Sequence, residues 1–258
     1  MDRSAWRLIV SGENPPSFNM GLDYALWESA RKGEAPVTLR FYRWKPASVS
    51  LGYRQAPEKL LNLSFCRQQR VPIVQRPTGG SALFHDLELT YSFTARAEAH
   101  PLFTSPVTSY LGICQALGQG LKRLGINLQV RGFSSGTEPT FSNQACFNLA
   151  TRHDLLVDGR KIVGSAQRRD RTSFLQHGSI LLSLRKSLWE QIFLQPVDFS
   201  RIVSLSELLE VLPQEKQLIL HLKEGFQEFF HCQFLQGSPT AAEDQQARHY
   251  ALSRFPPL

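Results

Sequence analysis

A cysteine and a lysine share one stretch of the sequence, QACFNLATRHDLLVDGRKIVGSAQRR, which runs over residues 144–169. Cys146 precedes Lys161, and the lysine sits in a run rich in Gly, Ser and Gln. A thiol attacks as its thiolate, and a nearby ammonium group raises the thiolate fraction by stabilising the anion. The two residues could therefore hold an acyl group as a thioester, or they could be a buried thiol beside an ordinary surface charge.

The other three cysteines have the patterns of structural residues. Cys114 falls on a helical apolar stripe, which predicts burial. Cys66 lies in a predicted helix and Cys232 follows an aromatic cluster, so we expect both to be buried as well. The sequence has no C-x-x-C pair and no metal-ligand spacing with histidine, so we expect neither a disulfide framework nor a metal site.

A second group of candidate residues surrounds the loop Arg76-Pro77-Thr78-Gly79-Gly80, between two strand-like runs. Paired glycines let the backbone approach a ligand closely and can present N–H groups to an anion. A hairpin loop without a ligand would have the same composition. His85 and His177 lie in strand-like runs, where they could line a pocket or move protons, although a structural role is the commoner one for such a histidine.

The composition excludes several classes of protein. Among 258 residues, 42% are hydrophobic and 20% are charged, which is typical of a soluble globular protein. We find no signal peptide and no apolar run of membrane-spanning length, so we expect a cytoplasmic protein without a membrane partner. The net charge is +7, but its cations are dispersed and not interleaved with stacking aromatics. We therefore expect an acidic protein partner or a small anionic ligand in preference to nucleic acid.

The expected elements alternate between helices and strands. Helices are predicted from about Asn19 to Ala30, from about Val107 to Leu124, and over much of 188–234. Strand-like runs lie between them, and LELTYSFTA alternates apolar and polar residues as in a sheet with one buried face. Asp158-Gly159 predicts a type I′ hairpin turn, because both central residues of that turn need positive φ.

This order of elements predicts an α+β fold. We expect a single domain over residues 1–236, with a largely antiparallel, mixed sheet flanked by helices. The segment 237–258 is polar and ends in Pro-Pro, which indicates a loose C-terminal tail.

Six blocks of the sequence together resemble one known family. They are NMGLDYAL, WKPASVSLGYRQ, QRPTGGSALFHDLELTYS, ACF, GRKIVGSAQRR and LQHGSILL, in this order. They resemble the lipoate-protein ligase A and octanoyltransferase family, within the biotin/lipoate protein ligase superfamily. The match spans about Asn19 to Leu182, whereas the glycine/arginine-rich loop of biotin ligases is absent. The resemblance implies the fold of that superfamily and a tunnel for a medium-length acyl chain beside the RPTGG loop.

The resemblance also implies roles for individual residues. Lys161 would contact the reacting carboxyl group, and Cys146 resembles the acyl-accepting cysteine of the octanoyltransferases found in Gram-positive bacteria. In the other octanoyltransferase branch the cysteine follows the lysine, where this sequence has none before Cys232. Backbone N–H groups near Gly79, Gly80 and Gly164 are candidates to hold an oxyanion. The full set of candidate substrate-binding residues is Arg76, Thr78, Gly79, Gly80, His85, Gly164, Ser165, Ala166, His177 and Gly178.

The sequence thus predicts an octanoyltransferase without a cofactor, acting as a monomer. It would take octanoate from octanoyl-acyl carrier protein onto Cys146 and pass it to a lysine of a lipoyl domain or of the glycine cleavage H protein. An ATP-dependent lipoate-protein ligase remains open, and would need ATP and Mg but no cysteine. A non-catalytic acyl-binding module and a transamidase acting between lipoyl proteins also remain open.

Overall fold

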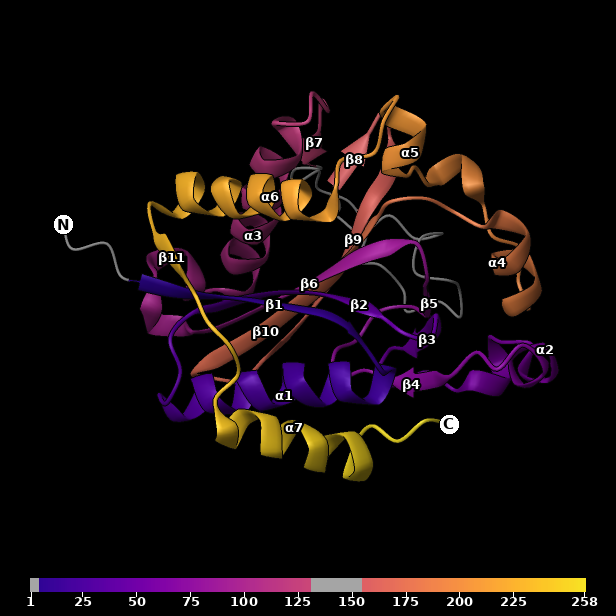
Figure 1. The fold of residues 1–258 in the computed structure, drawn as a ribbon, viewed down its shortest axis with the longest axis horizontal. Coiled ribbons are helices and arrows are strands. Elements are labelled where there is room, and N and C mark those ends of the chain that lie inside the picture. The colour runs from indigo at the N-terminus through magenta and orange to yellow at the C-terminus, as the bar shows by residue number, and fades with distance from the viewer. Residues whose placement is uncertain (1–4, 131–154) are drawn as a thin grey trace.

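The computed structural model describes residues 5–130 and 155–258 of the chain. Within them, eight strands form a main sheet in the order β11-β1-β2-β6-β10-β9-β8-β7 (Figure 1). These strands are β1 (Ala5–Asn14), β2 (Thr38–Trp44), β6 (Glu88–Arg96), β7 (Gln129–Val130), β8 (Leu155–Val157), β9 (Arg160–Arg169), β10 (Ser173–Leu181) and β11 (Gln233–Gln236). β1 pairs in parallel with β11 and with β2, and the other neighbouring pairs are antiparallel. The sheet is therefore mixed and largely antiparallel, as the sequence predicted.

A second sheet holds the RPTGG loop. It has three strands in the order β4-β3-β5, with β3 parallel to β4 and antiparallel to β5. These strands are β3 (Ser48–Leu51), β4 (Ile73–Gln75) and β5 (Leu83–His85). The short helices α2 (Leu63–Gln68) and α4 (Lys186–Ile192) pack with its apolar side chains. Because the RPTGG loop runs from β4 to β5, both of its ends are anchored in this small sheet.

Helices cover both faces of the main sheet (Figure 1). α3 (Pro106–Lys122) and α6 (Glu215–Phe230) pack together on one face, and α1 (Pro16–Lys32) and α7 (Ala241–Ser253) pack together on the other. The remaining short elements are α5 (Leu205–Leu208), η1 (Pro57–Lys59), η2 (Ala97–Ala99), η3 (Pro101–Phe103) and η4 (Phe199–Arg201). This α+β arrangement confirms the predicted fold class.

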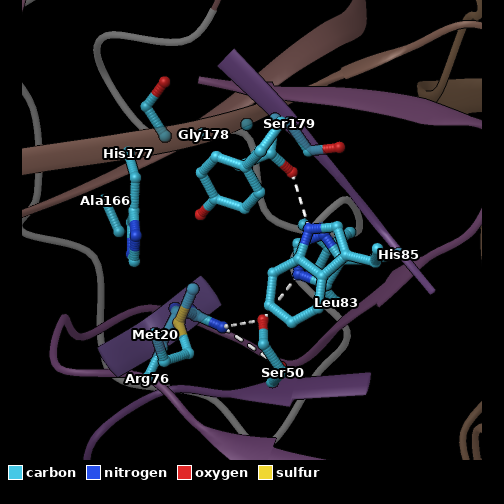
Figure 2. Close-up of a pocket in the computed structure, with 14 residues that line it drawn as sticks. Met20, Ser50, Arg76, Leu83, His85, Ala166, His177, Gly178 and Ser179 are labelled. Carbon is cyan, nitrogen blue, oxygen red and sulfur yellow. Dashed lines mark hydrogen bonds between the residues drawn. The ribbon is translucent and has the colours of Figure 1, made fainter. Parts of the chain in front are cut away.

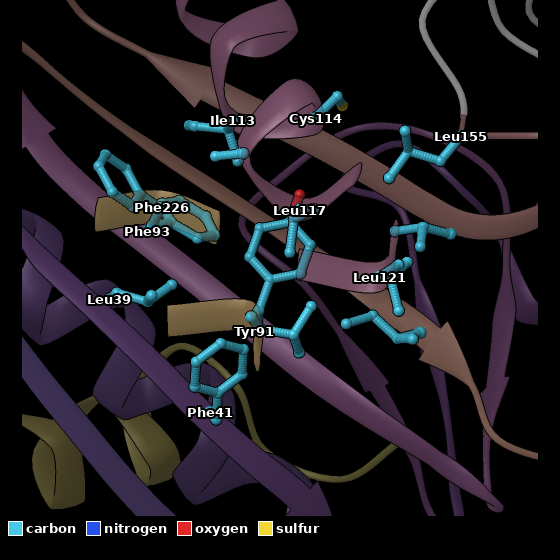
Figure 3. Packing of buried hydrophobic residues seen from close by; sticks show 14 of the residues in the cluster. Leu39, Phe41, Tyr91, Phe93, Ile113, Cys114, Leu117, Leu121, Leu155 and Phe226 are labelled. Carbon is cyan, nitrogen blue, oxygen red and sulfur yellow. The ribbon is translucent and has the colours of Figure 1, made fainter. Parts of the chain in front are cut away.

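The largest core lies between the main sheet and the pair α3 and α6. Leu39 and Phe93 from the sheet pack in one cluster with Ile113, Leu117 and Phe226 from the helices (Figure 3). Burial of each large apolar side chain contributes about 1.5–3 kcal/mol to stability. This core makes the sheet a rigid support for the polar side chains on its opposite face.

Strand β6 has the predicted alternation, but both of its faces are buried. Leu89, Tyr91 and Phe93 form the expected apolar face. The alternating polar residues Thr90 and Ser92 are also buried, because α1 and the small sheet cover them. Buried polar groups need hydrogen-bond partners within the protein, so this covered face carries a polar network.

The segment after Gly237 is a packed helix, which corrects the predicted loose tail. α7 begins with a capping box in which Thr240 and Glu243 bond each other's backbone. The Glu243 carboxylate is buried and accepts two hydrogen bonds from Arg7, at 2.7 and 2.8 Å. α7 also packs closely on α1, where the Ala247 carbonyl faces Gly21. A narrow stripe of buried residues and one ion pair hold this helix in place. Neither can be recognised from the polar composition of the segment.

The predicted burial of three cysteines and the predicted turn at Asp158-Gly159 are confirmed. Cys66, Cys114 and Cys232 are buried thiols. Asp158 and Gly159 have φ of 49° and 76°, as the type I′ turn between β8 and β9 requires. Among the helices of the described residues, none has the length and apolar character needed to cross a membrane.

Candidate active site

A small cavity lies where α1, the small sheet and strands β6, β9 and β10 meet (Figure 2). Its volume is about 30 Å³. Seven of the ten predicted substrate-binding residues line it: Arg76, His85, Gly164, Ser165, Ala166, His177 and Gly178. The other lining residues are Met20, Tyr42, Trp44, Ser50, Leu83, Thr90 and Ser179. The fold thus brings together residues from five of the six matched blocks, and several of the lining side chains are apolar.

Arg76 shapes the RPTGG loop from within. Its guanidinium is buried and points toward Ser50 (Figure 2), to which it donates at the backbone carbonyl and the hydroxyl. It also donates to the carbonyls of Gly79 and Ser81, at 2.7 and 2.8 Å, and to the Thr78 hydroxyl at 3.2 Å. Every nitrogen of the guanidinium therefore has a protein acceptor, and the cation holds the loop closed around itself.

Glycines allow the site's segments to approach each other closely. A Cβ on Gly52 would lie only 1.9 Å from the Gly80 carbonyl oxygen, so the RPTGG loop packs directly on the end of β3. A Cβ on Gly178 would lie 2.6 Å from the Gly164 carbonyl oxygen and 2.7 Å from Cε1 of Tyr91. Gly80 itself has φ of 88°, in the left-handed region that favours glycine.

His177 on β10 is held between a buried carboxylate and the loop. Its Nδ1 lies 3.1 Å from Oδ2 of Asp23, and its Nε2 lies 2.6 Å from the Thr78 hydroxyl. Asp23 comes from α1 and is fully buried. It also accepts hydrogen bonds of 2.7 Å from Arg40 and Tyr42. The Ser92 hydroxyl on β6 donates a third such bond, also of 2.7 Å.

The protonation of this group follows from its partners. Burial by itself would raise the pKa of the Asp23 carboxyl, but the Arg40 charge and the hydrogen bonds from His177 and Ser92 hold that pKa below its ordinary value. An ionised carboxylate can only accept hydrogen bonds, so Nδ1 of His177 carries the hydrogen. In neutral His177, Nε2 then carries a lone pair and accepts from the Thr78 hydroxyl.

His85 on β5 has a different setting. Its ring stacks on Trp44, with centroids 3.9 Å apart, and its Nε2 lies 2.8 Å from the Ser50 hydroxyl. Its Nδ1 lies 3.6 Å from the Glu88 carboxylate, too far for a hydrogen bond. Burial lowers the pKa of His85, although Glu88 opposes this. His85 is therefore a neutral ring on the cavity wall, between an aromatic face and a hydroxyl.

The remaining predicted residues lie beside the cavity or outside the described part of the chain. Thr78 is buried against His177, and Gly79 and Gly80 are exposed at the loop's surface. Lys161 is 2% exposed and lies on β9, three residues before Gly164, which is about 10 Å along a strand. It is not among the described residues that line the cavity. Cys146 falls outside the described residues.

The described residues were also compared with the requirements of a metal site. Within residues 5–130 and 155–258, no group of three or more His, Cys, Asp or Glu side chains could hold a metal ion.

Sequence reasoning missed the carboxylates and aromatic rings that support these residues. Asp23 lies in a helix and Glu88 in an alternating strand, where both would ordinarily face water. A usable signal was their position inside the matched blocks NMGLDYAL and LELTYS. Trp44 lies in a third block, and it donates from Nε1 to Thr90 at 2.8 Å, next to Glu88.

Comparison with curated proteins finds relatives that are named as octanoyltransferases. Octanoyltransferase LipM of Moorella thermoacetica is 41% identical over 71% of this chain and 67% of its own length. LipM of Bacillus subtilis is 37% identical over 88% of this chain and 87% of its own. LipM of Halalkalibacterium halodurans is 32% identical over 97% of this chain and 96% of its own.

Solved structures and a family model agree with these relatives. A lipoate-protein ligase A bound with ATP superposes with a TM-score of 0.81 at 21% identity, over 96% of this chain and 94% of that one. A putative lipoate protein ligase from T. acidophilum with bound lipoic acid superposes with a TM-score of 0.78 at 23% identity, over 95% of this chain and 94% of that one. At such identities the two structures support the fold. The model of the lipoyl protein ligase A/B catalytic domain matches residues 15–227, so this protein belongs to that family.

Proposed function

We propose that this enzyme moves octanoate from acyl carrier protein to a lysine of a lipoyl domain through a thioester on Cys146. The protein is an octanoyltransferase of lipoate biosynthesis, as its curated relatives are. The carrier, the acceptor and the thioester are our inference from the residues and the cavity. A protein of the same fold is the bi-partite lipoate protein ligase of Thermoplasma acidophilum, which was studied together with its E2 lipoyl domain, and we propose the same class of acceptor here.

One observation supports the proposal: five of the six matched blocks meet around one cavity that is lined by both apolar and polar residues. Met20, Leu83 and Trp44 supply apolar surface, and Gly164 and His177 lie with the polar groups. We propose that the eight-carbon chain lies along these apolar side chains. Met20 is the most adaptable of them, because methionine is unbranched and flexible.

The reaction divides into two exchanges at the acyl carbon. In the first, a C–S bond to Cys146 forms while the C–S bond to the carrier breaks, and the carrier thiolate leaves with the proton of Cys146. In the second, a C–N bond to the acceptor lysine forms, the enzyme C–S bond breaks, and the thiol is restored. We assign Lys161 to stabilise the thiolate, and N–H groups near Gly79, Gly80 and Gly164 to bind the oxyanion.

The geometry of Arg76 favours this reaction over adenylation. In an ATP-dependent ligase, Arg76 would help to hold the acyl-adenylate. Here its guanidinium donates to acceptors within the protein, at Ser50, Thr78, Gly79 and Ser81. Binding a phosphate would require breaking those bonds and reshaping the loop. We therefore propose a monomeric enzyme that needs neither ATP nor Mg, with acidic carrier and acceptor proteins suited to its net charge of +7.

The test is transfer to an apo lipoyl domain with two alternative donors. Octanoyl-acyl carrier protein without ATP should modify the domain, as followed by intact mass. Free octanoate with ATP and Mg should modify it at least a hundredfold more slowly. The reverse order of the two rates would replace this proposal with the ligase function.

A further inference from the structure

The second exchange needs a base, and this inference rests on the proposed function. The acceptor lysine has an ordinary pKa of about 10.4, so near neutral pH it arrives as an ammonium ion without a lone pair. It must lose a proton before its nitrogen can attack the thioester. A general base in the right place speeds such a step by about 10²–10⁴-fold.

We propose that His177 takes this proton, and that Asp23 is the residue that positions His177 for the task. The Asp23 carboxylate accepts from Nδ1, so the lone pair of the neutral ring is on Nε2. Nε2 lies 2.6 Å from the Thr78 hydroxyl, and His177 is one of the residues that line the cavity. His177 thus links the cavity to the RPTGG loop through its basic nitrogen.

Asp23 is well suited to orient the ring because it is itself fixed. Arg40 and Tyr42 on β2 and Ser92 on β6 each donate to its oxygens at 2.7 Å. A carboxylate held by groups from two strands cannot rotate freely, so it fixes both the plane and the tautomer of His177. Arg40 also stacks on the ring of Tyr42, at 3.8 Å from its centroid, which adds to the rigidity of the group.

His85 is a weaker candidate for the same role. Its Nδ1 has no hydrogen-bond partner among the described residues, and the Glu88 carboxylate is 3.6 Å away. That carboxylate instead accepts from Thr90 and Ser179, at 2.6 to 2.8 Å. The short bond of His85, at 2.8 Å from Nε2 to the Ser50 hydroxyl, does not set its tautomer by itself, because a hydroxyl can donate or accept, whereas a carboxylate only accepts. The stacked Trp44 fixes the plane of the ring but leaves open which nitrogen is basic.

Thr78 provides a path for the proton. Its hydroxyl donates to His177 Nε2 and accepts from Nε of Arg76 at 3.2 Å. The ammonium gives one proton, through the Thr78 hydroxyl or directly, to Nε2. The nitrogen lone pair then forms the C–N bond, the C–S bond breaks, and the departing thiolate takes the second proton from nitrogen. The imidazolium returns its proton to solvent, so thioester and ammonium become amide, thiol and a free proton.

The experiment separates the two exchanges in the full-length enzyme. The enzyme is first loaded from octanoyl-acyl carrier protein, and the acyl-enzyme is then mixed with an apo lipoyl domain while the loss of acyl mass is followed. In His177→Ala, transfer should fall by about 10²–10⁴-fold, and it should fall far more than loading does. Added imidazole should restore part of the transfer rate. His249→Ala, at an exposed histidine of α7, is the matched control and should transfer normally.

Asp23→Asn tests the positioning role. The rate of transfer should fall at least tenfold more than the rate of loading, whereas a purely structural loss would lower both rates alike. This change leaves Arg40 without its ion-pair partner and could unfold the protein. In that case the result of His177→Ala decides whether the inference holds. Transfer at the wild-type rate in His177→Ala, or a slowed transfer that imidazole leaves unchanged, would overturn the inference. If the wild-type enzyme forms no acyl-enzyme, the proposed function fails instead.

Discussion

The contact between Gly52 and the RPTGG loop gives a strong prediction for one methyl group. In Gly52→Ala the new Cβ would lie 1.9 Å from the Gly80 carbonyl oxygen and 3.2 Å from the carbonyl carbon of Gly79. Both neighbours are backbone, so the loop has to move as a unit and strain its bonds to Arg76. Overpacking of this kind costs about 1–3 kcal/mol of the free energy of unfolding. For a chain of this size, that corresponds to a fall in Tm of about 2–12 °C.

Two measurements check this prediction. Thermal and urea unfolding give the loss of stability, and loading from octanoyl-acyl carrier protein gives the effect on the site. A displacement of about 1 Å at a catalytic loop can cost about a hundredfold in rate, so loading should fall steeply. The control for stability is Gly79→Ala, because a Cβ there meets no atom within 4 Å. Wild-type stability and loading in Gly52→Ala would show that the loop does not pack on β3 as described.

Three further predictions follow from the cavity and the buried ion pairs. Met20→Ala should cost about 2–5 kcal/mol and raise loading of decanoyl relative to octanoyl carrier protein in a mass-spectrometric competition; an unchanged preference would remove Met20 from the acyl site. Arg40→Met should cost about 3–5 kcal/mol in urea unfolding, because it leaves Asp23 buried without its cation; a change below about 1 kcal/mol would contradict the buried pair. Burial would raise the pKa of Glu243, but its hydrogen bond from Arg7 holds that pKa below the ordinary value of 4.5. The ionised carboxylate therefore stabilises the fold fully above pH 4.5, and this contribution is lost as the pH falls through the lower pKa of the folded state. The fall in Tm below pH 4.5 should be smaller in Arg7→Gln, and an equal fall would exclude this ion pair as its cause.

Local sequence patterns predicted much of the fold but missed the long-range pairings. The helix around Met20, the alternation of β6 and the Asp158-Gly159 turn each have a local signal. β1 and β11 were not predicted as strands, because they are stabilised by parallel pairing between segments more than two hundred residues apart. The same limit explains the helix after Gly237, whose ordering depends on α1 and Arg7.

The site divides in the same way. The RPTGG loop and the two histidines could be found because glycine pairs and imidazoles are conspicuous, and the cavity does bring them together. Asp23 and Glu88 could not be found from local patterns, because the pattern of a helix or strand does not reveal that its polar face is covered. Nor could the sequence predict that Arg76 binds its own loop, because the sequence does not distinguish an arginine that bonds within the protein from one that binds a ligand.

The central claim is that Cys146 holds the octanoyl group in transit, and intact mass tests it directly. After incubation with octanoyl-acyl carrier protein and no ATP, the wild-type enzyme should gain one octanoyl group that hydroxylamine removes. Cys146→Ser should gain none and should not modify a lipoyl domain. A Cys146→Ser enzyme that transfers at the wild-type rate, and only when ATP is supplied, would contradict the account.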